Sequence, residues 1–181
     1  MPIFKYLAAG LCLAVTLTPA AAAVVSIGEG LQAEVGFSPD GDSQPIILKA
    51  INAARQEILV AAYSFTSKPV STALLAAHKR GVKVFLVADE KGNAGRYTAT
   101  TFLANQGVPV RLNGRYKILH HKFMVIDRRH LQTGSFNYSK SAYEANAENV
   151  LLLREVPELA MAYAGEWRRL WDEGTPLAPA Y

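Results

Sequence analysis

The residues of this sequence best suited to chemistry lie between His120 and Asn137. His120 and Lys122 are two positions apart, and so are Ser135 and Asn137. Side chains on a strand alternate between its two faces, so each pair shares a face if these segments are strands. Two such strands side by side would bring together an imidazole, an ammonium, a hydroxyl and an amide. This set can bind a phosphate, because lysine neutralises non-bridging oxygens while serine and asparagine donate hydrogen bonds to them. A neutral imidazole can also attack phosphorus and form a covalent intermediate that water later hydrolyses.

Six residue identities in this region fall at fixed spacing. They form the pattern H-x-K-x4-D-x6-G-S-x-N, which consists of His120, Lys122, Asp127, Gly134, Ser135 and Asn137. This is the pattern of the phospholipase D superfamily, and the sequence resembles in particular its small bacterial endonucleases, which carry one copy per chain. The resemblance extends to Val35–Pro39, Ala62–Thr66 and Glu148-Asn149. It therefore covers nearly all of the chain that follows the N-terminal segment.

The resemblance implies a catalytic role for each polar residue of the motif. His120 would be the nucleophile that becomes a phosphohistidine. Lys122, Ser135 and Asn137 would bind the phosphoryl oxygens.

The resemblance also implies supporting roles. Glu148 would be catalytic by accepting a hydrogen bond from the other ring nitrogen of His120, which fixes the tautomer and orientation of the ring. Glu144 is the competing candidate for this carboxylate. Asp127 and Gly134 would support the motif structurally, and Asp127 would hold a loop without contacting substrate.

One copy of the motif does not complete the reaction. In-line displacement places the nucleophile and the leaving oxygen on opposite sides of phosphorus, so one imidazole cannot serve both. Neither His78 nor His130 has a lysine two residues further on. We therefore expect a two-fold homodimer in which one His120 attacks and the other, protonated, acts as the general acid. Such a pair predicts a bell-shaped dependence of the rate on pH.

The residue types predict a reaction that needs neither a metal nor another cofactor. Two-metal nucleases hold their cations with carboxylates, whereas lysine and imidazolium supply the positive charge here. His120, His121 and His130 are the alternative, as zinc ligands. Adjacent residues on a strand point to opposite faces, however, and the only cysteine is Cys12, so we expect no metal site.

The charge distribution favours an anionic partner. The chain has 19 Lys and Arg residues against 15 Asp and Glu, a net charge of +4. Between Glu90 and Asp127 there is no acidic residue, and the basic residues of this stretch are Lys91, Arg96, Arg111, Arg115, Lys117 and Lys122. If they share a face, they can bind a phosphate backbone, with Arg96, Arg115 and Lys117 as candidate substrate-binding residues. The alternative is a solvated stretch whose charge is compensated by acids elsewhere in the fold.

The N-terminal residues resemble a cleavable secretion signal. Lys5 precedes the apolar run Tyr6–Leu17, and Ala20–Ala23 provides small residues in an A-x-A arrangement. The run is shorter than the about 20 apolar residues that a membrane-spanning helix needs. We expect residues 1–23 to be removed and the mature protein to be exported, periplasmic or secreted, without stable membrane association. An uncleaved anchor or a buried first helix is the alternative.

Residues 24–181 alternate between strand and helix patterns and predict a single α/β domain. The expected strands are Glu34–Phe37, Glu57–Tyr63, Val82–Ala88, Lys122–Ile126, Leu131–Ser135 and Asn149–Leu153, and the expected helices are Pro45–Ala54, Val70–Lys79, Thr98–Asn105 and Pro157–Trp171. Asp89–Gly95 is expected to be a loop. The spacing favours a mixed, largely parallel sheet with helices on both faces. Trp167 and Trp171 are four residues apart on the last helix, which favours core packing over base stacking.

Three functions fit these features. The first is a nonspecific endonuclease that hydrolyses DNA, with RNA as a further candidate substrate. The second is a phospholipase D-type hydrolase of phospholipid or small diesters that uses the same residues. The third is a nucleic-acid-binding module without catalysis, which an intact motif disfavours.

Overall fold

The computed structural model describes residues 23–26 and 32–180. The expected signal segment, residues 1–23, lies outside the described residues apart from Ala23. The strands are β1 (Ala23–Ser26), β2 (Gln32–Ser38), β3 (Glu57–Ala62), β4 (Lys83–Asp89), β5 (Val110–Asn113), β6 (Lys122–Ile126), β7 (His130–Gly134), β8 (Glu148–Arg154) and β9 (Thr175–Pro176). The helices are α1 (Ser43–Ala53), α2 (Lys68–Lys79), α3 (Glu90–Asn93), α4 (Ala99–Asn105), α5 (Lys140–Glu144) and α6 (Pro157–Glu173).

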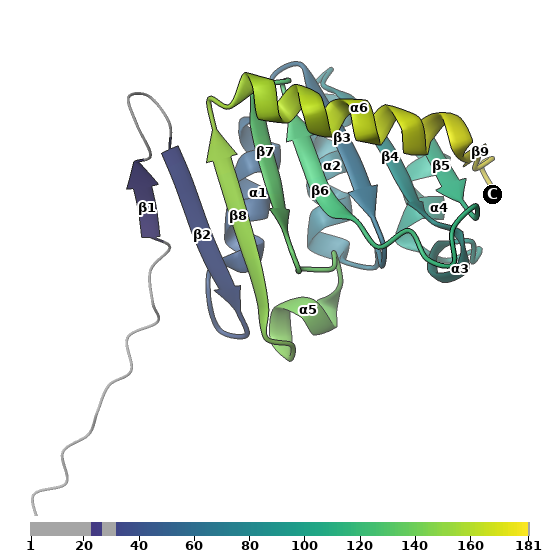
Figure 1. Ribbon diagram of the computed structural model, residues 1–181. Helices are drawn as coiled ribbons and strands as arrows, with labels where there is room; N and C mark the ends of the chain where they lie inside the picture. Colours follow the sequence, from purple (N-terminus) through teal and green to yellow (C-terminus); the bar gives the residue numbers. More distant parts are fainter. Residues whose placement is uncertain (1–22, 27–31, 181) are drawn as a thin grey trace, which may run out of the picture.

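The described strands form one mixed sheet in the order β1-β2-β8-β7-β6-β3-β4-β5-β9. Helices α1, α2 and α4 cover one face, and the long helix α6 crosses the other (Figure 1). The predicted α/β class with helices on both faces is confirmed. Each predicted strand and helix also overlaps an observed element of the same type.

The expectation that the sheet is largely parallel is wrong. The pairs β3–β4 and β4–β5 are parallel, and every other pair of neighbours in the described sheet is antiparallel. For β6 and β7 the reason is the length of their connection. Only Asp127–Arg129 joins β6 to β7, which allows a hairpin but not the long crossover that parallel strands need. The segment Asp89–Gly95, expected to be a loop, contains the short helix α3.

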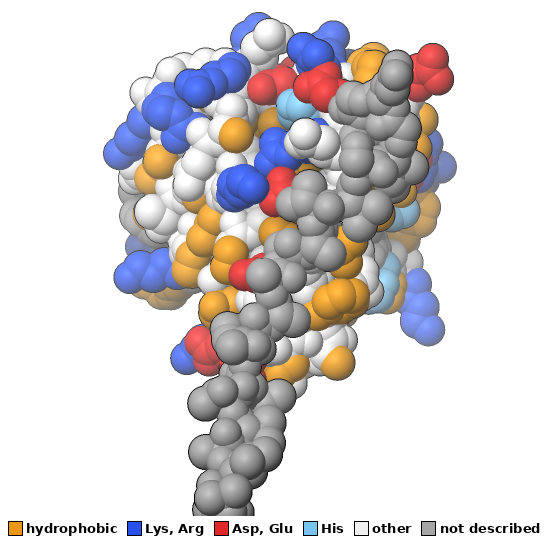
Figure 2. Space-filling model, turned by 90° about the vertical axis from the view of Figure 1, so that its left-hand side faces the viewer, with side chains coloured by type: hydrophobic (Ala, Val, Ile, Leu, Met, Phe, Trp, Pro, Cys, Tyr) orange, Lys and Arg blue, Asp and Glu red, His pale blue; other side chains and the backbone are white. Residues whose placement is uncertain are grey.

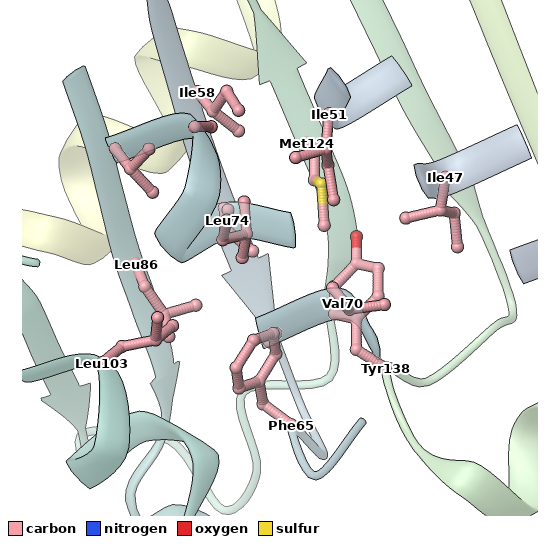
Figure 3. Close-up of a cluster of buried hydrophobic side chains, with 14 of the residues drawn as sticks. Ile47, Ile51, Ile58, Phe65, Val70, Leu74, Leu86, Leu103, Met124 and Tyr138 are labelled. Carbon is pink, nitrogen blue, oxygen red and sulfur yellow. The ribbon is translucent and has the colours of Figure 1, made fainter. Parts of the chain in front are cut away.

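The hydrophobic core has one part on each face of the sheet. Under α1 and α2 lie fully buried side chains that include Phe65, Leu74, Met124 and Tyr138 (Figure 3). Burying these side chains holds the helices on the sheet, because each Å² of apolar surface removed from water stabilises the fold by about 25 cal/mol.

The part of the core under α6 contains the two tryptophans. The Trp167 indole is buried and donates a hydrogen bond of 2.9 Å to the carbonyl oxygen of Val60. Its ring stacks on that of Trp171, with centroids 4.9 Å apart. The predicted core role of these residues is confirmed.

The motif residues gather at one edge of the sheet because of the strand register. Lys122 begins β6 opposite Ala62, which ends β3. Gly134 ends β7, and Glu148 begins β8 opposite Ser38 at the end of β2. We call this edge, at the bottom of Figure 1 near α3 and α5, the motif edge. No helix in the described part of the chain is long and apolar enough to cross a membrane.

Candidate active site

His120 and Lys122 lie together at the start of β6, as their spacing predicts. The His120 side chain is exposed, whereas Lys122 is only 7% exposed. The Lys122 ammonium donates a hydrogen bond of 2.8 Å to the carbonyl oxygen of His120. Burial lowers the pKa of Lys122, and the nearby negative charge of Glu148 partly offsets this effect. The site therefore has a buried cation bound to the backbone of the residue that carries an accessible imidazole.

The second half of the motif follows the end of β7. The Ser135 hydroxyl donates a hydrogen bond of 2.6 Å to Glu148 and accepts one of 3.0 Å from the backbone N–H of Asn149. Gly134 has φ +149°, and a Cβ there would lie 2.2 Å from the carbonyl oxygen of Asn149. Only glycine fits this close approach. Asn137 contributes a buried Oδ1 atom without a hydrogen-bond partner among the described residues. This oxygen can only accept hydrogen bonds, so the amide N–H groups of Asn137 are the ones suited to a phosphoryl oxygen.

The Glu148 carboxylate lies in the site but does not contact His120 within the chain. It accepts hydrogen bonds from Ser135 and from the side chain of Asn146, at 2.6 and 3.0 Å. Among the described residues no hydrogen bond joins Glu148 to His120. The competing candidate, Glu144, is exposed and forms an ion pair with Lys140 at 3.4 Å.

Asp127 lies at the opposite end of β6 from the motif edge. Its carboxylate accepts three hydrogen bonds of 2.7–3.0 Å, from the backbone N–H groups of Arg55, Gln56 and Glu57. Its backbone has φ +52°, a conformation that aspartate tolerates better than most residues. These contacts hold the connection between α1 and β3, which agrees with the structural role expected for Asp127.

Comparisons with known proteins identify the family. Residues 47–171 match the family described as "Cardiolipin synthase, PLD-like domain", which is more than half of the chain. The chain belongs to the phospholipase D family.

Relatives in the phospholipase D family are about one third identical to this chain over the aligned residues. The mitochondrial cardiolipin hydrolase of Canis lupus familiaris is 32% identical over 139 residues, which are 76% of this chain and 54% of that protein. The chain thus spans about half the length of that relative. The phospholipase D of Rickettsia felis is 32% identical, over 78% of this chain and 72% of its own. Among solved structures, the phospholipase D family member Nuc from Salmonella typhimurium is 38% identical, with a TM-score of 0.79. The match covers 82% of this chain and 99% of Nuc.

The candidate substrate-binding residues of this phospholipase D family member are exposed in the connections beside the motif edge. Arg96 lies over the ring of Tyr97, and Arg115 forms an ion pair of 3.3 Å with Glu173. Lys117 is also exposed. Outside these three, the Arg111 guanidinium donates to a backbone carbonyl of α6. The positive charge of the stretch between Glu90 and Asp127 is therefore compensated in part by Glu173.

The basic side chains do not form a continuous surface on every side of the molecule. Figure 2 shows the side formed by β1 and β2, where Lys and Arg side chains are scattered and Asp and Glu side chains lie between several of them. This side of the molecule therefore carries charges of both signs.

The histidines considered as zinc ligands lie apart. His121 forms an ion pair of 3.2 Å with Glu166 on α6, and His130 lies at the start of β7, away from the motif edge. Burial lowers the pKa of His130, although the charge of Glu155 works against this. Among the residues that the structure describes, no group of three or more His, Cys, Asp and Glu side chains could hold a metal ion.

Sequence reasoning missed three residues that hold the site together: Tyr63, Asp89 and Asn93. Asp89 is 1% exposed, and its carboxylate accepts a hydrogen bond of 2.7 Å from the backbone N–H of Leu119, next to His120. Asn93 is fully buried and binds the backbone on both sides of the segment after β3. The signal for Asp89 was available, since two carboxylates, Asp89 and Glu90, come at the end of a buried apolar strand.

Proposed function

We propose that this protein is an endonuclease that hydrolyses DNA without base preference and without a metal or other cofactor. RNA is a further candidate substrate. One observation carries the proposal. The exposed His120 and the buried Lys122, whose ammonium binds the backbone carbonyl of His120, lie at the edge that also holds Ser135 and Asn137. A phosphodiester placed there would meet a nucleophile, a cation and polar side chains together.

The reaction proceeds in two displacements at phosphorus. A ring nitrogen of His120 attacks, an N–P bond forms, and the P–O bond to the leaving nucleoside breaks. The leaving oxygen takes a proton from the His120 of a second copy. Water then attacks the phosphohistidine, gives its proton to that second imidazole and breaks the N–P bond. Lys122 neutralises the charge on the non-bridging oxygens, and Asn137 donates its amide hydrogens to them, in both steps.

A homodimer supplies the second histidine in this proposal. Large apolar side chains are exposed in the segments that reach the motif edge: Phe37 is 62%, Tyr97 is 84% and Ile118 is 42% exposed. A second copy facing this edge would cover apolar surface that is exposed in the single chain. The same symmetry would bring the two His120 side chains face to face.

The choice of nucleic acid over lipid rests on the exposed cations beside the site. Arg96 and Lys117 can bind phosphates on either side of the cleaved bond, so activity should fall as salt rises. The alternative is hydrolysis of phospholipid, which the names of the cardiolipin hydrolase and phospholipase D relatives favour. We further propose that residues 1–23 direct export and that the mature protein acts in the periplasm or medium.

The deciding experiment is cleavage of supercoiled plasmid by the mature protein in excess EDTA. The wild type should cleave, and His120→Ala should be slower by at least about a thousandfold, because the nucleophile is gone. His121→Ala is the matched control, since its neighbouring ring pairs with Glu166 on α6. That variant should retain activity.

Other outcomes separate the alternatives. Loss of wild-type activity in EDTA, with recovery on adding a divalent metal, would refute the metal-free mechanism. If no plasmid is cleaved, vesicles containing cardiolipin and small phosphodiesters are the next substrates. Binding of DNA without hydrolysis of any of these would support the non-catalytic binding module.

A further inference from the structure

Among the described residues, an aromatic ring lies against the His120 imidazole. In the part of the chain that the structure describes, this imidazole forms no hydrogen bond. The ring of Tyr63 lies against it instead, with centroids 4.7 Å apart and planes tilted by 52°. The ammonium of Lys122 lies 5.1 Å from the centroid of the same Tyr63 ring. A single aromatic ring therefore contacts both the nucleophile and the cation of the site.

Tyr63 is itself held by buried polar side chains. It follows directly after β3, where the amide of Asn93 donates a hydrogen bond of 2.7 Å to its carbonyl oxygen. The same amide donates to the carbonyl oxygen of Asp89, and its oxygen accepts from the N–H of Phe65. The Asp89 carboxylate in turn accepts from the N–H of Leu119. These bonds join the segments that carry Tyr63 and His120 through two residues that are at most 1% exposed.

We propose that Tyr63 is a positioning residue that aims the His120 imidazole and holds Lys122 beside it. The inference rests on the proposed function, in which His120 is the nucleophile. Attack on phosphorus needs the ring nitrogen in line with the leaving oxygen, and a displacement of about 1 Å can cost about a hundredfold in rate. With no hydrogen bond to fix its orientation, the exposed His120 ring would otherwise rotate between rotamers.

The physical basis is the face of the tyrosine ring. The face of an aromatic ring carries partial negative charge, so it attracts the Lys122 ammonium. In the copy whose His120 acts as the general acid, the same face attracts the imidazolium form of that ring. The phenolic hydroxyl is not required for either contact. The ring, and not the hydroxyl, is therefore the functional part of Tyr63.

The test compares Tyr63→Phe, which keeps the ring, with Tyr63→Leu, which removes it. On a fluorescent oligonucleotide in EDTA, kcat of Tyr63→Leu should fall by about ten- to a hundredfold while KM changes by less than about threefold. Tyr63→Phe should retain kcat within about threefold. Equal kcat values for Tyr63→Leu and wild type would overturn the proposal, and so would a loss in Tyr63→Phe as large as in Tyr63→Leu.

A second measurement needs neither activity nor a variant that folds. In the wild type, nuclear Overhauser contacts should join the Tyr63 ring protons to the His120 ring and to the ε-methylene of Lys122. Their absence would overturn the proposal whatever the kinetics show. If the wild type cleaves no DNA, the proposed function fails separately, and these contacts still decide whether Tyr63 holds the imidazole.

Discussion

At the scale of single residues, Glu148 affects the site through the charge of its neighbour Lys122. Burial lowers the pKa of Lys122, and the Glu148 carboxylate works against this by favouring the ammonium form. Only the ammonium can neutralise a phosphoryl oxygen. Glu148 therefore extends the pH range over which Lys122 is charged, a role that does not require contact with His120.

The substitution Glu148→Gln tests this role because it removes the charge at nearly constant size. The pKa of Lys122 should fall further, so its ammonium is lost at a lower pH. The pH at which Lys122 loses its ammonium proton, followed by nuclear magnetic resonance of its ε-methylene group, should then fall. Glu144→Gln is the control, since Glu144 is exposed and pairs with Lys140. An unmoved Lys122 titration in Glu148→Gln, or an equal shift in Glu144→Gln, would contradict the assignment.

At the scale of elements, the connection between β5 and β6 carries His120 without regular structure of its own. It is tied to the end of β4, where the Asp89 carboxylate accepts hydrogen bonds from the backbone N–H groups of Lys91 and Leu119, at 3.1 and 2.7 Å. The Lys91 ammonium also donates to the carbonyl oxygen of Lys117. These contacts place the nucleophile at a fixed point of the sheet edge.

Replacing Asp89 by Asn should loosen this connection. An amide has one acceptor oxygen, so one of the two buried N–H groups loses its partner, which costs about 1–3 kcal/mol of unfolding free energy. Cleavage should also slow, because the residue next to His120 is no longer fixed. Asp172→Asn is the matched control: its ion pair with Arg168 is exposed and should contribute less than about 1 kcal/mol. Urea unfolding followed by tryptophan fluorescence measures the unfolding free energy of both variants. Equal losses in Asp89→Asn and Asp172→Asn would refute the role of Asp89.

The elements show how far local sequence can predict this fold. The apolar run after Lys122 predicted the bounds of β6. The alternation of side chains along a strand predicted which of them share a face. Strand direction was missed because pairing is a long-range property, although the short Asp127–Arg129 connection already required a hairpin. The strands β5 and β9 were missed because they are short and gain their stability from neighbours.

Some features of the site could be predicted from local sequence, and others could not. His120, Lys122, Ser135 and Asn137 could be predicted, because their types and spacing lie within two short segments. The contact between Tyr63 and His120 could not, since it depends on the pairing of β3 with β6. No hydrogen bond joins His120 to Glu148 among the described residues, where Glu148 accepts from Ser135 and Asn146, and the predicted bond stays a prediction.

At the scale of the whole molecule, subunit mixing tests whether two copies share one active site. Wild-type chains unfolded and refolded with an equal amount of His120→Ala should form mixed dimers that lack one histidine, so only pure wild-type dimers cleave. Total activity should then be about one quarter of that of the same total amount of wild-type chains, because dimers pair at random. Chains that act alone would retain about one half. A parallel mixture with Glu144→Gln should lose nothing, which controls for refolding yield. Retention of half the activity in the His120→Ala mixture would leave the second histidine without a role, and the general acid would have to be sought within the chain.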